Sequence, residues 1–140
     1  MKKMVLMILP LVVLFSSCGD KKEDAQKALL DKVLAVHDEV MPLMGDIMKY
    51  KKQLNTKIDE LIDAGAEENT DQIAKLKEAV KSLENSHDGM MNWMHGFDRN
   101  FEGKVQEEVL DYLNDQMTKI QAVAKETNVA LQKAEELLAE

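Results

Sequence analysis

The sequence predicts an all-α protein, an antiparallel up-down-up bundle of three long helices with coiled-coil packing. The composition is rich in Lys, Glu, Leu and Ala, with only 4% aromatic residues and two prolines, which favours helix over strand. From about residue 25 onward, apolar residues recur at alternating steps of three and four, as they do along the seam of a packed helix. The periodic stretches are joined by short loops, so successive helices should alternate in direction.

The first 17 residues are typical of a secretion signal. Two lysines are followed by an apolar run over residues 4–15, which is too short to span a membrane comfortably. Two serines then lead into Cys18, and this arrangement resembles a bacterial lipoprotein signal, whose cysteine is acylated and becomes the first residue. One departure is that Phe15 stands where the usual motif has Leu. An ordinary cleaved signal and a short uncut anchor are the alternatives.

The predicted domain organisation has three parts. Residues 1–17 form the signal peptide, residues 18–24 the lipidated cysteine and a polar tether, and residues 25–140 a single helical domain. Cys18 is the only cysteine, so the chain can form no intramolecular disulfide and offers neither a zinc ribbon nor another cysteine nucleophile. Stability must therefore come from packing.

The first predicted helix begins near Ala25 and ends at Gly65, a natural C-cap. Pro42 interrupts it and predicts a kink near residues 38–42, or a full break that would give four helices. Its predicted seam consists of Leu30, Leu34, His37, Met41, Met44 and Met48, and it continues through Leu54, Ile58 and Leu61.

The second predicted helix is capped by Asn69 or Thr70, and a turn over residues 98–103 separates it from the third. The seam of the second helix consists of Ile73, Leu76, Val80, Leu83, His87, Met90, Met94 and Phe97. The seam of the third helix consists of Val109, Leu113, Met117, Ile120, Ala124, Thr127, Leu131, Ala134 and Leu138.

The charge balance limits the possible partners. The formal net charge is −8, and it becomes −10 without the two lysines of the signal. An acidic surface repels phosphate backbones and anionic lipid headgroups, which argues against nucleic acid and against electrostatic docking on a membrane. The lipid on Cys18 is therefore the predicted membrane contact.

If the first two predicted helices fold back on each other about a turn near residues 65–68, methionine and histidine side chains should come together at one end of the bundle. Thioether and imidazole groups suit copper(I) or silver(I), and Trp93 beside them is similar to the indole that caps the ion in some periplasmic copper chaperones. Haem ligation by one Met and one His is weaker, because the last helix has no histidine and no C-x-x-C-H motif is present. Core packing is the favoured interpretation. The candidate ligands are His37, Met41, Met44, His87, Met90 and Met94.

Signals of catalysis are missing from the sequence. It contains no Gly-rich phosphate loop and no H-E-x-x-H motif. The pairs His37–Asp38 and His87–Asp88 are sequence neighbours, which point about 100° apart on a helix, so we expect no proton relay from them. The sequence therefore predicts that the protein is not an enzyme.

Two segments carry a family resemblance. Together with the signal, AVHDEVMPLM at residues 35–44 and MMNWM at residues 90–94 resemble small lipoproteins of Bacteroidetes that are often labelled "viral A-type inclusion protein". The resemblance covers most of the mature chain and implies an outer-membrane setting, without an established activity. Residues 22–24, Lys-Glu-Asp, resemble a surface-export signal, so both a periplasm-facing and a cell-surface position stay open.

These observations predict a non-enzymatic, lipid-anchored helical bundle of the cell envelope with a protein-interaction or structural role. The alternative is a copper(I)- or silver(I)-binding lipoprotein that uses the Met/His cluster. In both cases the lipid on Cys18 attaches the protein to the membrane. For the interaction or structural role, the expected partner is another protein of the envelope.

Overall fold

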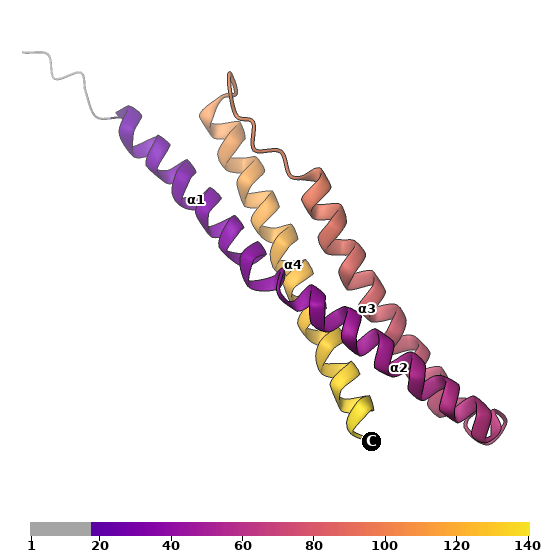
Figure 1. Ribbon diagram of the computed structural model, residues 1–140. Coiled ribbons are helices and arrows are strands. Elements are labelled where there is room, and N and C mark those ends of the chain that lie inside the picture. Colours follow the sequence, from indigo (N-terminus) through magenta and orange to yellow (C-terminus); the bar gives the residue numbers. More distant parts are fainter. Residues whose placement is uncertain (1–17) are drawn as a thin grey trace, which may run out of the picture.

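The computed structural model describes residues 18–140, which form four helices and no strand (Figure 1). Residues 1–17, the predicted signal, lie outside the described residues. α1 and α2 run in one direction, α3 returns, and α4 runs alongside in the direction of α1. The predicted all-α, up-down-up bundle is confirmed. The helices are α1 (Cys18–Val40), α2 (Leu43–Gly65), α3 (Thr70–Gly96) and α4 (Gln106–Ala139).

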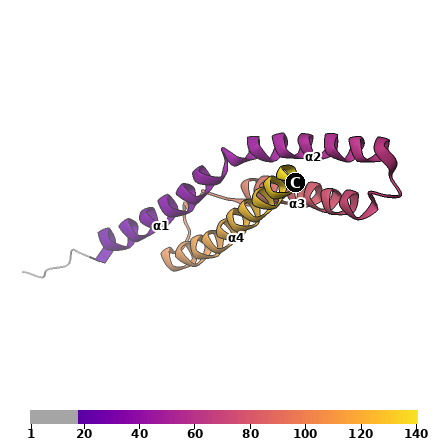
Figure 2. The same ribbon diagram turned by 90° about the horizontal axis from the view of Figure 1, so that it is seen from below.

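The first long helix is divided in two at Met41 and Pro42. Proline has no N–H group, so the helical hydrogen bond that residue 42 would donate is missing. The N–H of Met44 donates to Met41 O at 3.1 Å and the N–H of Gly45 to Pro42 O at 3.3 Å, both bonds being one residue tighter than in an α-helix. Figure 2 shows the resulting change of direction between α1 and α2. The predicted kink at this proline is confirmed.

Residues 18–24 are helical, although the sequence analysis assigned them to a polar tether. Lys, Glu, Asp and Ala are compatible with a helix, and no proline stands between Cys18 and the apolar part of α1 to end it. The polar segment therefore continues α1 toward its N-terminus.

α4 is the central helix of the bundle. It packs against α1, α2 and α3, whereas the backbones of α1 and α3 make no close contact within residues 18–140. Because α4 has neighbours on several sides, it buries more than one seam: beside the buried row that includes Leu113 and Ile120, a second row is partly buried. That second row consists of Met117, Ala124, Leu131 and Leu138.

The buried seams of α2 and α3 include predicted residues such as Met44 and Met90, but they are shifted by one position at Met48 and Met94. Ile47 and Trp93 are buried, while their neighbours Met48 and Met94 are 55% and 40% exposed. Adjacent positions are both apolar here, so the sequence alone gives two overlapping seams. Which one is buried depends on where α4 lies.

The turn between α2 and α3 depends on Gly65 and Asn69. Gly65 has φ +132°, in the region that favours glycine, and it ends α2 as predicted. The side-chain amide of Asn69 donates to Gly65 O at 2.9 Å and to Leu61 O at 3.3 Å. Asn69 occupies the N-cap position of α3, but its side chain makes no cap bond to α3. It caps the last carbonyls of α2 instead.

Candidate functional site: a groove between α1 and the end of α3

A row of aromatic rings connects the last turn of α1 with the end of α3 and the beginning of α4. The Trp93 ring lies 5.7 Å from the ring of His37 on α1 and stacks on Phe97 at 4.7 Å, between centroids. Phe97 lies parallel to Tyr112 of α4 at 6.2 Å, and Phe101 meets Tyr112 edge-on at 6.1 Å. These contacts are within the usual range for aromatic pairs and fix the orientation of the rings.

The segment between α3 and α4, residues 97–105, is held by polar contacts around Asp98. The N–H of Asp98 donates to the Tyr112 hydroxyl at 2.8 Å. The Asp98 carboxylate accepts from the N–H of Asn100 at 2.8 Å and from Lys104 Nζ at 3.1 Å. The Asn100 N–H, and after it Lys104, hold the pKa of the Asp98 carboxyl below its usual value. The predicted turn is therefore a connection with its own hydrogen bonds.

A groove of about 240 Å³ opens between α1 and the end of α3. We call it the Trp93 groove. Its walls combine apolar and aromatic side chains with two charged or polar groups, the His37 imidazole and the Arg99 guanidinium. The Trp93 side chain is 8% exposed, and its Nε1–H has no hydrogen-bond partner. The residues that line the groove are Leu34, His37, Trp93, Met94, Phe97 and Arg99.

Two of the three helical histidines, His37 and His87, are each hydrogen-bonded to the aspartate that follows. His37 Nδ1 lies 2.9 Å from Asp38 Oδ1, and His87 Nδ1 lies 3.3 Å from Asp88 Oδ1. The expectation that these neighbours point apart is wrong, because exposed side chains can turn toward each other along the helix surface. An ionised carboxylate only accepts, so each Nδ1 carries the proton. Nε2 is then the free nitrogen of the neutral ring.

The six predicted metal ligands are spread over several environments. Met44 and Met90 are buried in the hydrophobic core, and Met41 packs against it. His37 and Met94 line the Trp93 groove, whereas His87 lines a second groove of about 310 Å³ beside Met48. Within residues 18–140, no three His, Cys, Asp or Glu side chains gather closely enough to hold a metal ion. Of the six, His37 and Met94 are the pair that one groove brings together.

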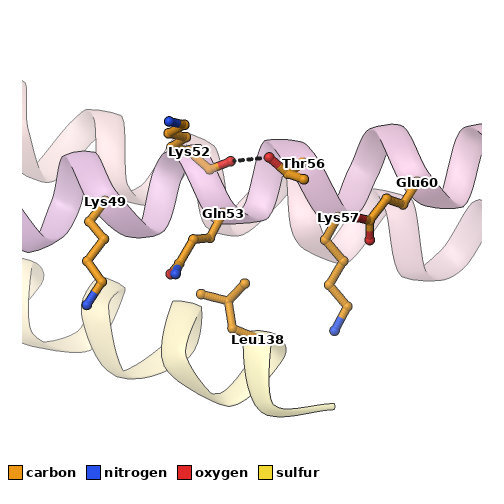
Figure 3. Close-up of a pocket in the computed structure, with 7 residues that line it drawn as sticks. All are labelled: Lys49, Lys52, Gln53, Thr56, Lys57, Glu60 and Leu138. Atoms are coloured by element: carbon orange, nitrogen blue, oxygen red, sulfur yellow. Dashed lines mark hydrogen bonds between the residues drawn. The ribbon is translucent and has the colours of Figure 1, made fainter.

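A larger groove, about 590 Å³, lies between α2 and the end of α4 (Figure 3). Lys49, Gln53 and Lys57 point from α2 toward α4, and Leu138 points back between them. Lys57 Nζ donates to the carbonyl of Leu137 at 2.8 Å, a contact that caps the end of α4. Its lining side chains are exposed or half-buried, so this groove offers no buried polar group to a ligand.

Comparison with protein-family models, with curated proteins and with solved structures gave no match. The resemblance to small Bacteroidetes lipoproteins therefore stays a prediction. In the described part of the chain, every helix is either too short or too polar to cross a membrane. Cys18 is the first residue of α1, so the helix that lines the Trp93 groove also carries the predicted lipid site.

The sequence analysis missed Arg99. It is the only arginine of the chain and follows Phe97 closely, in a segment that was predicted simply as a turn. A lone arginine between aromatic residues in an acidic chain is the signal that could have identified it. Its position beside His37 depends on how far α3 extends, which periodicity does not define.

Proposed function

We propose that this chain is a non-enzymatic, lipid-anchored helical bundle of the bacterial cell envelope that acts through protein contact. The Trp93 groove is the observation that supports the proposal. It offers aromatic and thioether surface, and Met94 is 40% exposed there. Protein-binding surfaces are enriched in aromatic residues, Met and Arg, and all three line this groove.

The anchor is tested by Cys18→Ser in the full chain. Without the thiol no lipid can be attached, so the protein should move from the membrane fraction to the soluble fraction of cells. Retention of the variant in the membrane fraction would contradict the lipid anchor.

Protein contact is tested by a photo-crosslinking amino acid at position 94, in the groove, in living cells. We expect a discrete crosslinked product of higher mass from position 94. The control position is Glu126, which is exposed on α4 and lies outside the groove. Equal products from both positions, or none from position 94, would count against the groove as a contact site.

A second candidate function is binding of copper(I) or silver(I), which the pairing of His37 and Met94 in one groove favours. His37 Nε2 and the Met94 thioether would be the ligands, with the Trp93 indole beside them. Anaerobic titration of copper(I) against a competing chelator should then show one equivalent bound, lost in Met94→Leu. Met48→Leu, which changes an exposed methionine of the second groove, is the control and should keep the metal.

A further inference from the structure

We propose that the Trp93 groove binds the free C-terminal carboxylate of a partner protein whose last residue is apolar. This inference rests on the proposed function and names the segment of the partner that is recognised. Three features of the groove support it: the charge of Arg99, the unpaired Nε1–H of Trp93, and the size of the space between the apolar side chains.

The guanidinium of Arg99 is available to an anion. Within residues 18–140 it makes no ion pair and no hydrogen bond, although the chain is strongly acidic. The neighbouring carboxylate of Asp98 is already engaged by Lys104 Nζ at 3.1 Å. On α1, the carboxylate of Asp38 is engaged by His37 of the groove. Because no carboxylate of the described residues pairs with it, Arg99 offers a planar fork of donors suited to a carboxylate.

Trp93 supplies a second, independent donor. Its Nε1–H is buried and has no acceptor in the described structure, a state that costs stability. A bound carboxylate has two oxygens and accepts several hydrogen bonds. If the indole rotates so that its Nε1–H faces the groove, one oxygen would satisfy Trp93 Nε1–H while the other accepts from Arg99. Binding would therefore pair the buried Nε1–H of Trp93, which has no partner among the described residues.

The remaining walls define the body of the ligand. Leu34, Met94 and Phe97 are apolar, and the volume of about 240 Å³ is small for a ligand pocket, enough for one side chain and its terminal carboxylate. Capture of a chain terminus through its carboxylate is a recurring mode of peptide recognition. A free C-terminus with Leu, Ile or Phe as the last side chain combines the required charge and apolar surface.

The experiment uses nuclear magnetic resonance of the full chain in a non-ionic detergent, free of metal. The protein has one tryptophan and one arginine, so the Trp93 indole N–H and the Arg99 Nε–H each give a single, unambiguous signal. The probe is N-acetyl-Gly-Gly-Leu with a free carboxylate, and its C-terminal amide is the matched control. We expect both signals to shift with the acid, with a dissociation constant of about 1 mM or below, and to stay in place with the amide.

Two variants separate the charge from the walls. Arg99→Gln should weaken binding of the acid about tenfold or more, whereas Lys125→Gln, which removes an exposed charge from α4, should leave it unchanged. Met94→Leu keeps the apolar wall and should retain binding, which distinguishes this site from a copper site that needs the thioether. The wild-type circular dichroism spectrum should be retained in all three.

Equal shifts with the acid and the amide would overturn the proposal, because the carboxylate would then not be recognised. An unchanged affinity in Arg99→Gln would overturn it as well. Neither result would affect the proposed function, which fails separately if position 94 gives no crosslinked product in cells.

Discussion

Thr127 is buried in the middle of α4, with a hydroxyl group that has no hydrogen-bond partner. An unpaired buried hydroxyl costs free energy, and valine has nearly the same shape without it. We expect Thr127→Val to raise the free energy of unfolding by about 1 kcal/mol, measured by chemical denaturation. The control is Thr118→Val, since Thr118 is exposed on the same helix and donates to Asn114 O. A loss of stability in Thr127→Val would mean that the hydroxyl has a partner in solution.

Asp98 makes the segment between α3 and α4 sensitive to acid. Its pKa is lower in the folded protein than the ordinary value of 3.8, first through the Asn100 N–H and then through Lys104. A group with a lowered folded pKa stabilises the protein above its unfolded pKa, and this contribution is lost as the pH falls through the folded pKa.

Asp98→Asn should therefore reduce stability at pH 7, and the difference from wild type should vanish below the folded pKa, under pH 3.8. Asn still accepts from the Asn100 N–H but loses the ion pair with Lys104. Thermal unfolding between pH 2 and pH 7 measures the difference. Asp59→Asn, which removes one exposed charge from α2, is the control. A difference independent of pH would show that the ionised carboxylate is not what stabilises the loop.

At the scale of the elements, the two glycines of α2 should respond oppositely to the same substitution. Gly65 has φ +132°, where a Cβ is strained, so Gly65→Ala should lower the free energy of unfolding by about 1 kcal/mol or more. Gly45 lies within the helix without a positive φ, and a Cβ there would meet nothing within 4 Å. Gly45→Ala should therefore raise stability by about 0.5–1 kcal/mol. The pair is measured by denaturant unfolding, and equal effects would refute the assigned backbone conformations.

The elements show what sequence reasoning can and cannot supply. Pro42, Gly65 and Asn69 act through local backbone chemistry, so the break and the turn were predictable from single residues. The seams were predicted one position away at Met48 and Met94, since α2 and α3 carry adjacent apolar residues and only packing against α4 selects between them. For the same reason Trp93 was expected beside the seam and is found within it.

The candidate site was predictable only in part. His37, Met94 and Trp93 were named because their residue types and spacing are unusual. His37 and His87 lie on α1 and α3, whose backbones make no close contact among the described residues. No local sequence pattern predicts this arrangement of the two helices. Likewise, Arg99 reaches the groove through the path of residues 97–105, where side-chain contacts such as Asp98 to Lys104 define the loop.

At the scale of the whole molecule, α4 connects the three other helices, so we expect the bundle to unfold in one transition. Ile120 is fully buried near the centre of α4, and Ile120→Ala should cost about 2–5 kcal/mol. Circular dichroism and Trp93 fluorescence should report the same midpoint, because the loss is shared by all helices. Val129→Ala, at a side chain 58% exposed on α4, is the control and should change stability by less than about 0.5 kcal/mol. Two separate midpoints would show that the aromatic end unfolds by itself.

The central position of α4 also bears on how the chain is made. A ribosome releases the N-terminus first, so α1 emerges long before α4, the helix against which it mainly packs. α2 and α3 can pair early as a hairpin, but α1 must wait until the last 34-residue helix has been synthesised. Because α1 and α4 lie at opposite ends of the sequence and pack against each other, the bundle cannot form fully until translation ends. That delay would keep it loose enough to be threaded through a secretion channel, as its first residues predict.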